Sequence, residues 1–238
     1  MIRLVGEPPG RDTEVRVSAL YSFGKTFLAP PLRLLWRPKV SGLSNIPSEG
    51  ALILAANHLS VVDSIIVPVV TPRPVYYLAK AEYFRHPVIG PLLTGLNNIP
   101  VDRTGGREAL LAIDAAAPVL KAGKVLGIHP EGTRSPDGRL YRGRPGTVKL
   151  ALDTGATIVP VGLIGTDKIH PIGASLPRLA RCEVVFGEPM DLTPYAAEPA
   201  NAKLIREVTL TMMREIAKLT GQEYVGRYAR RPAAASSD

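Results

Sequence analysis

A histidine and an aspartate five residues apart form the most distinctive chemical pattern in the sequence, Asn57-His58-Leu59-Ser60-Val61-Val62-Asp63. The pattern follows a continuous apolar run, 51–56, that is typical of a buried strand, and it precedes a predicted short helix. The histidine is therefore expected in a loop at the carboxyl end of a strand. His58 is suited to taking a proton from an alcohol, and Asp63 would fix its tautomer. The same sequence pattern would also result if Asn57 capped the helix and His58 were a buried structural residue.

The sequence offers no protein nucleophile to accompany this pair. It contains no Gly-x-Ser-x-Gly motif, and its single cysteine, Cys182, lies in a predicted late strand. A His–Asp pair alone is expected to activate a hydroxyl of the substrate itself. A metal hydrolase that uses His58, Asp63 and Glu131 is less favoured, since metal sites usually bring together more ligands. We predict no metal.

A polar loop with the composition of a phosphate site follows a second apolar strand. Residues 129–135 read His-Pro-Glu-Gly-Thr-Arg-Ser and come directly after the predicted strand 124–128. Backbone N–H groups near a glycine, hydroxyls and a guanidinium can together hold a phosphate, although an ordinary polar turn has the same composition. Two less specific segments accompany this loop, namely a strand over 98–103 that ends in Arg103 and an apolar strand over 158–163.

Alternating strand and helix patterns predict how these segments are positioned. Strands are predicted at 51–56, 75–79, 98–103, 124–128, 157–163 and 182–186. Helices are predicted at 64–70, 87–96, 107–121, 147–153 and 200–219. This order indicates a single α/β domain over 41–220, with a mostly parallel or mixed central sheet flanked by helices. Residues 221–238 are predicted to form a disordered basic tail.

An amphipathic two-helix segment within residues 1–40 is predicted to precede this domain. Pro30-Pro31 is expected to end the first helix, and Pro31 can open the second. The apolar positions are Leu20, Phe23, Phe27, Leu28, Leu32, Leu35 and Trp36, and the flanking cations are Lys25, Arg33, Arg37 and Lys39. Apolar faces bordered by cations are typical of an interfacial membrane anchor, but two helices that cap the core would look similar.

Composition narrows the classes of partner. The 238 residues include 29 Lys and Arg against 21 Asp and Glu, a net charge of +8 that favours an anionic partner. Aromatic residues are only 5% of the chain and do not alternate with basic ones, so phosphates and lipid headgroups are favoured over nucleic acid. Cys182 alone cannot form an intrachain disulfide. No signal peptide and no apolar run of about 18 residues is found, so we expect a cytosolic protein that is peripheral on a membrane.

Together and in this order, the four segments resemble the 1-acylglycerol-3-phosphate (lysophosphatidic acid) and glycerol-3-phosphate acyltransferase family. The blocks of that family are an N-H-x-x-x-x-D box, an Arg-ending strand, a P-E-G-T-R-S-like loop and a V-P-V-like strand. All four match here within residues 41–190, and the first and third are the specific ones.

The resemblance implies an O-acyltransferase that moves a fatty acyl group from acyl-CoA or acyl carrier protein to 1-acylglycerol-3-phosphate, making phosphatidic acid. It implies that His58 is the general base and Asp63 its partner. It also implies an acceptor-phosphate site made by Arg103, Glu131, Gly132, Thr133 and Arg134, with added charge from Lys80. The thioester is a co-substrate, so no cofactor is implied. The expected location is the cytoplasmic face of the cell membrane, at the phospholipid surface.

Two departures from the family pattern stand out. His129 occupies a position where relatives usually carry an aromatic residue, typically Phe, and no spanning helix is present, so the segment 18–36 would have to replace it. Two alternatives stay open. The acceptor would instead be glycerol-3-phosphate, another lysophospholipid or a glycolipid, or the chain would be a non-catalytic protein that binds membrane surfaces.

Overall fold

The computed structural model describes residues 17–101, 108–196 and 201–230. Its central strands are β1 (Lys39–Ser41), β2 (Leu52–Ala56), β3 (Val75–Lys80), β4 (Asn98–Val101), β5 (Val125–Ile128), β7 (Thr157–Ile164) and β8 (Glu183–Phe186). They form one sheet in the order β1-β8-β7-β2-β5-β3-β4. Every neighbouring pair is parallel except β7 and β8, which are antiparallel. The prediction of a single α/β domain with a mixed, mostly parallel sheet is confirmed.

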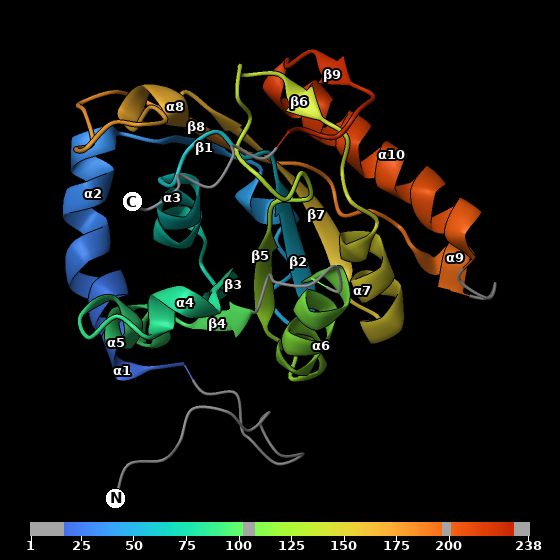
Figure 1. The fold of residues 1–238 in the computed structure, drawn as a ribbon, viewed down its shortest axis with the longest axis horizontal. Coiled ribbons are helices and arrows are strands. Elements are labelled where there is room, and N and C mark those ends of the chain that lie inside the picture. The colour runs from blue at the N-terminus through green and yellow to red at the C-terminus, as the bar shows by residue number, and fades with distance from the viewer. Residues whose placement is uncertain (1–16, 102–107, 197–200, 231–238) are drawn as a thin grey trace, which may run out of the picture.

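Helices cover both faces of this sheet (Figure 1). The α-helices are α1 (Ala19–Phe23), α2 (Ala29–Trp36), α3 (Asp63–Val70), α4 (Ala81–Phe84), α5 (Ile89–Gly95), α6 (Glu108–Lys121), α7 (Gly146–Thr154), α8 (Thr166–Ile169), α9 (Thr193–Ala196) and α10 (Ala202–Thr220). A π-helical turn, η1 (Gly24–Leu28), joins α1 to α2, and a 3-10 turn, η2 (Leu43–Asn45), follows β1.

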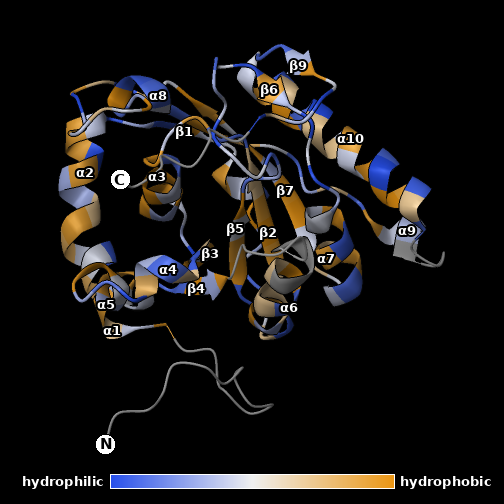
Figure 2. Cartoon of the chain, viewed as in Figure 1, coloured by the Kyte–Doolittle hydropathy of each residue, from blue (hydrophilic) through white to orange (hydrophobic). Residues whose placement is uncertain are grey.

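The middle strand β2 is buried on both faces of the sheet. Leu52, Leu54 and Ala56 pack into a cluster that includes residues of α2 and α3, and the alternate residues Ile53 and Ala55 pack into a cluster with α6, α7 and α10. Successive side chains of a strand point to opposite faces, so a strand covered on both sides reads as an unbroken apolar run. Figure 2 shows the central strands β2, β5 and β7 coloured mainly as hydrophobic.

The amphipathic N-terminal segment does not break at Pro30-Pro31 as predicted. The chain stays in the right-handed helical conformation through both junctions, from α1 through η1 into α2. The two prolines lack N–H groups, and the helix adapts to this with a wider turn in which the Ala29 N–H donates to the Gly24 carbonyl five residues back. In the described ranges, no helix has both the length and the apolar character needed to cross a membrane.

Two of the cations predicted to border a membrane anchor point into the domain instead. The Lys25 Nζ donates to the carbonyls of Pro68 and Thr71 at 2.5 and 2.6 Å, and the Arg33 guanidinium donates to the Val69 carbonyl at 2.7 Å. These carbonyls belong to the end of α3, where helical partners are missing, so the cations satisfy them. Burial, followed by repulsion from Arg33, lowers the pKa of Lys25 to about 8. This segment is therefore attached to the domain by hydrogen bonds as well as by Trp36.

The residues after α10 differ from the predicted disordered tail 221–238. A short strand, β9 (Tyr224–Val225), pairs with β6 (Leu140–Tyr141) in a second, two-stranded sheet. The Arg142 N–H donates to the Arg227 carbonyl at 3.0 Å, and Ala229 is buried. Polar composition indicated disorder, but these backbone groups find partners in the loop beyond β5. Residues 231–238 lie outside the described ranges.

Candidate active site

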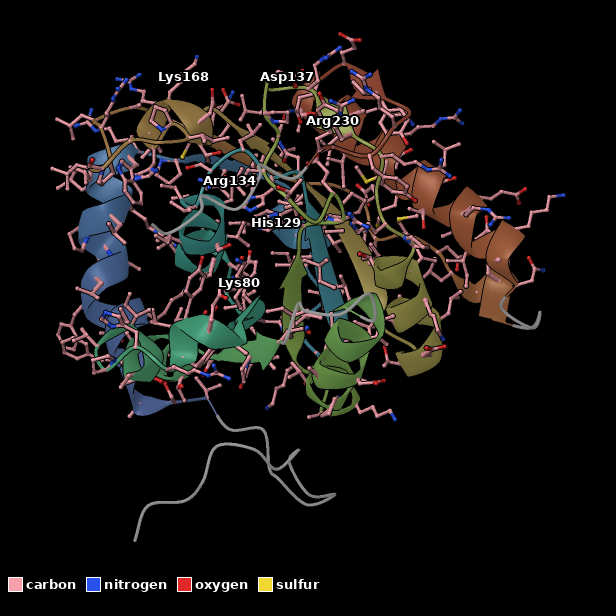
Figure 3. The ribbon with its side chains drawn as sticks, viewed as in Figure 1. Lys80, His129, Arg134, Asp137, Lys168 and Arg230 are labelled. Atoms are coloured by element: carbon pink, nitrogen blue, oxygen red, sulfur yellow. The ribbon has the colours of Figure 1, made fainter. Side chains whose placement is uncertain are left out.

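The predicted site residues meet at the carboxyl edge of the parallel strands. His58 lies two residues after β2, His129 follows β5 directly, and Lys80 is the last residue of β3. Residues of β2, β5 and β3 lie side by side in parallel register, so these three positions are at the same edge of the sheet. Figure 3 shows Lys80, His129 and Arg134 in the middle of the molecule, between α2 and α10.

His58 and Asp63 form the predicted pair. The His58 Nδ1 lies 2.9 Å from Asp63 Oδ2, and the same oxygen accepts the N–H groups of Leu59 and Ser60 at 2.6 and 2.8 Å. Burial alone would raise the pKa of Asp63, but its hydrogen bond with His58, the nearby imidazoles and the Ser60 N–H outweigh burial and lower that pKa. An ionised Asp63 requires the proton on His58 Nδ1, which leaves Nε2 with the lone pair that a base needs.

The loop 129–135 holds the backbone of His58 from both sides. The His58 N–H donates to Glu131 Oε1 at 3.0 Å, and the Ser135 N–H donates to the His58 carbonyl at 2.7 Å. The other carboxylate oxygen of Glu131 accepts the Tyr141 N–H at 2.9 Å. The two specific motifs of the sequence are thus joined directly, although 73 residues separate Glu131 from His58.

Glu131 has a different role from the predicted phosphate contact. Its side chain is buried, and both carboxylate oxygens are occupied by backbone N–H groups. Burial, partly offset by these two hydrogen bonds, raises the pKa of Glu131 to about 7. A carboxylate in this position would repel a phosphate, so we assign Glu131 to positioning His58 and the loop.

His129 lies directly against His58. The two rings are stacked, with their centroids 3.9 Å apart and an angle of 7° between their planes. The Tyr77 ring also stacks against His129, with a centroid distance of 5.8 Å. The His129 Nδ1 donates to the carbonyls of Ala56 and Asn57 at 3.2 and 3.0 Å, which leaves Nε2 as an acceptor. Burial, and then repulsion from His58, lowers the pKa of His129 to about 3, so it is neutral at physiological pH. A histidine at position 129 departs from the family pattern, but like the usual aromatic residue it places a flat ring here.

Asn57 is a bridge between strands rather than a helix cap. Its side chain exchanges two hydrogen bonds with the backbone of Leu163 in β7, at 2.8 and 2.7 Å, and also donates to the Gln222 side chain at 2.9 Å. This fixes the end of β2, from which His58 projects. Gln222 in turn donates to the Gly138 carbonyl, so the segment after α10 supports the site.

Three other predicted phosphate residues, Gly132, Thr133 and Arg134, lie in the same loop. Gly132 has a φ of +74°, and a side chain there would meet the Arg144 Nε at 2.8 Å, so this position requires glycine. Thr133 and Arg134 are half-buried in the same loop. Lys80 pairs with Glu82 at 2.9 Å. Arg103 lies outside the described residues.

Sequence reasoning missed two contributors. Ser135 was part of the motif but received no role, and it holds both His58 and the loop through its N–H and hydroxyl groups. Arg144 follows β6 and lies over Gly132. In the sequence, the only feature that pointed to Arg144 was its position after Gly143 in a basic run. The arrangement places a base with a fixed tautomer next to a loop of hydroxyl, N–H and guanidinium groups, which suits attack by a hydroxyl on a substrate that carries a phosphate.

Comparisons with known proteins agree with this chemistry. The family model described as "Acyltransferase" matches residues 37–164. A 1-acyl-sn-glycerol-3-phosphate acyltransferase of Bacillus subtilis is 30% identical over 187 residues, which are 78% of this chain and 89% of that protein. A protein of the same description from Borreliella burgdorferi is 35% identical over 128 residues, 54% of this chain. The match spans only 51% of the Borreliella protein.

A solved structure has the same fold. The crystal structure of the 1-acyl-sn-glycerophosphate (LPA) acyltransferase PlsC from Thermotoga maritima aligns with a TM-score of 0.63. The alignment covers 83% of this chain and 82% of that one, at 22% sequence identity. At this identity the likeness concerns the arrangement of strands and helices.

Proposed function

Because the chain belongs to the 1-acylglycerol-3-phosphate acyltransferase family, we propose that this acyltransferase moves a fatty acyl group from acyl-CoA to the free hydroxyl of 1-acylglycerol-3-phosphate. The products are phosphatidic acid and free CoA. The observation that carries the proposal is the His58–Asp63 pair, whose backbone is held by the same loop that presents Thr133 and Arg134.

The proposed reaction needs one base and no enzyme-bound intermediate. His58 Nε2 takes the proton of the acceptor hydroxyl while the oxygen attacks the thioester carbonyl, and Asp63 stabilises the imidazolium that forms. The tetrahedral intermediate then expels the thiolate, which takes the proton back from His58 Nε2. A new ester bond replaces the thioester bond, and His58 returns to its neutral state.

The neighbouring loop is proposed to hold the acceptor phosphate. The Thr133 hydroxyl and the Arg134 guanidinium are the groups suited to this contact, since charge-assisted hydrogen bonds to phosphate are strong. Lys80, at the same edge of the sheet, remains a predicted contributor, as does Arg103, which lies outside the described residues. Fixing the phosphate would orient the hydroxyl toward His58, and orientation of this kind can contribute about 7 kcal/mol or more.

A mass-spectrometric product assay tests the function. The purified protein is incubated with a mixture of acyl-CoA thioesters and a panel of acceptors: 1-acylglycerol-3-phosphate, glycerol-3-phosphate, lysophosphatidylcholine and monoacylglycerol. We expect phosphatidic acid as the main product. Preferential acylation of one of the other acceptors would refute the assigned acceptor, and the absence of any acylated product would refute the proposed function.

We further propose that the N-terminal helices rest on the cytoplasmic surface of the cell membrane. Six apolar side chains of α1, η1 and α2 are between 41% and 71% exposed: Leu20, Phe23, Phe27, Leu28, Leu34 and Leu35. Val88, Ile89 and Leu92 of the neighbouring α4–α5 region are also exposed. Large contiguous apolar patches of this kind mark sites of membrane or protein contact.

Flotation with phosphatidylglycerol-containing vesicles tests this placement. Combining Phe27→Ser with Leu34→Ser should leave the protein with the unbound fraction, because both side chains are largely exposed and their loss should not disturb the core. The matched control, Phe27→Leu with Leu34→Ile, should float like the unmodified chain. Unchanged flotation of the serine variant would exclude this face as the contact.

A further inference from the structure

A basic cavity lies beside the active site, on the other side of the loop 129–135 from the N-terminal helices. Its volume is about 410 Å³, within the range of roughly 300–1,000 Å³ that is usual for small-molecule sites. It lies between the first turns of α10 and the segment that carries β6, and β9 closes one side. Its charged and aromatic lining residues are Arg142, Lys203, Arg206, Glu207, Tyr224 and Tyr228.

The charges of this cavity suit an anion. Three cations line it against one carboxylate, Glu207. Lys203 and Arg206 are exposed on the same side of α10. Within residues 17–101, 108–196 and 201–230, no ion pair is formed by either of them or by Arg142. Unpaired guanidinium and ammonium groups around a concave surface are typical of phosphate recognition.

The cavity also has an aromatic wall that is held in place. Two guanidinium groups lie close to the Tyr228 ring, with the Arg142 Cζ at 5.2 Å and the Arg144 Cζ at 5.3 Å from its centroid. These distances allow cation–π attraction between Tyr228 and both arginines. Tyrosine rings and guanidinium planes are the surfaces on which a nucleobase stacks.

The cavity is connected to the active-site loop by hydrogen bonds. The Arg144 N–H donates to the Pro130 carbonyl at 2.8 Å, and the Tyr141 N–H donates to Glu131, which also holds His58. A molecule bound in the cavity would therefore lie beside the reacting groups without occupying their place.

We propose that this cavity binds the adenosine 3′,5′-diphosphate end of the acyl-CoA donor, an inference that rests on the proposed function. The phosphates would contact Arg142, Lys203 and Arg206. The adenine would stack on the ring of Tyr224 or Tyr228. The pantetheine arm would then pass along the loop 129–135 and bring the thioester to His58. The donor is accordingly a CoA thioester, because an acyl carrier protein has no nucleotide with which to fill a concave site.

The position of the cavity favours a nucleotide over a lipid headgroup. The cavity lies by α10 and β9, whereas the exposed apolar side chains lie on α1 and α2 at the opposite side of the molecule (Figure 1). A donor that arrives from water should present its charged end on the side that faces away from the membrane.

Calorimetric titration with adenosine 3′,5′-diphosphate tests the inference on the full chain. Combining Lys203→Ala with Arg206→Ala removes two exposed cations, and losing one charge-assisted hydrogen bond weakens binding by about tenfold or more. We expect the dissociation constant and the KM for acyl-CoA to rise by about 100-fold in this variant. The kcat and the KM for 1-acylglycerol-3-phosphate should not change. The control that combines Arg181→Ala with Lys218→Ala removes the same charge from exposed positions outside the cavity and should bind normally.

The outcomes separate this inference from the proposed function. No binding of the nucleotide by the unmodified chain, or equal binding by the Lys203/Arg206 variant, would overturn the cavity assignment while acyl transfer stands. A rise in the KM for 1-acylglycerol-3-phosphate instead of the KM for acyl-CoA would also overturn it, since the cations would then serve the acceptor phosphate. Nucleotide binding that depends on these cations, without acyl transfer to any acceptor, would support the cavity and refute the proposed function.

Discussion

Replacing His129 with phenylalanine should change how the stability of the protein depends on pH. His129 is buried against His58, and burial is the main reason why its pKa is lowered from 6.5 to about 3. In the unfolded chain the same imidazole would titrate near its ordinary value. As the pH falls below about 6.5, the His129 imidazole becomes protonated in the unfolded state but stays neutral in the folded state. This group therefore lowers the free energy of unfolding. Phenylalanine keeps a flat ring in the stack but cannot titrate.

The size of the effect follows from the two pKa values. At pH 5 a folded-state pKa of about 3 leaves His129 neutral, while most unfolded chains are protonated there. The difference lowers the free energy of unfolding by about 2 kcal/mol at pH 5 relative to pH 8. Glu131 acts in the opposite direction, because its pKa is raised from 4.5 to about 7, so its stabilising contribution is present at pH 5 and is lost as the pH rises through 7. Between pH 5 and pH 8 the contributions of His129 and Glu131 therefore largely cancel in the unmodified chain, and the comparison with the variant isolates His129.

Urea unfolding at pH 8 and pH 5 measures this difference. Between these two values the unmodified chain should lose about 2 kcal/mol more stability than His129→Phe, with Glu131 present in both proteins. His86→Asn, which removes an exposed imidazole, serves as the control. Two parallel pH profiles for the unmodified chain and His129→Phe would refute the buried, neutral state assigned to His129.

Three further substitutions test the site itself. Asp63→Asn should lower kcat by on the order of 10³–10⁴, because a neutral amide cannot stabilise the imidazolium that forms on His58, and an unchanged kcat would exclude that role. Arg134→Ala should raise the KM for 1-acylglycerol-3-phosphate by about tenfold but hardly affect monoacylglycerol, and an equal change for both acceptors would argue against a phosphate contact. Glu131→Gln should cost about 1–3 kcal/mol of stability in urea unfolding, since its amide would face the N–H of either His58 or Tyr141, and a neutral effect would contradict the two observed hydrogen bonds.

The sequence predicted the parts of the site that depend on local patterns. The apolar run of β2 identified a strand buried on both faces, and the His–Asp spacing placed the pair in the loop after it. Because parallel strands end at one edge, the positions of His58 and the loop 129–135 could be expected together. The hydrogen bonds between them confirm that these two motifs adjoin.

Contacts between distant segments could not be predicted in this way. The family resemblance implied that Glu131 belongs to the phosphate site, but its carboxylate reaches backbone N–H groups on two other segments. Lys25 and Arg33 border apolar residues in the sequence, yet the π-helical turn and the packing of α2 direct them to the end of α3. Such outcomes depend on the rotation of an element in the finished fold, which periodicity does not encode.

The contacts of the segment after α10 could not be predicted from the sequence either. β6 and β9 contain two residues each, too few to give a periodic signal, and their pairing depends on Gln222 and Tyr228 finding partners near the active-site loop. Arg103 was predicted from a strand end and lies outside the described residues, so its role remains a prediction.

Transfer of labelled acyl groups from acyl-CoA to 1-acylglycerol-3-phosphate by His58→Ala tests the central claim most directly. The substituted side chain is 18% exposed, and Glu131 and Ser135 hold the backbone of residue 58 independently of it, so circular dichroism should show an intact fold. We predict that kcat falls by at least about 10³-fold, since the base that takes the proton of the acceptor is removed. Turnover near that of the unmodified chain would contradict the claim that the imidazole at position 58 activates the acceptor.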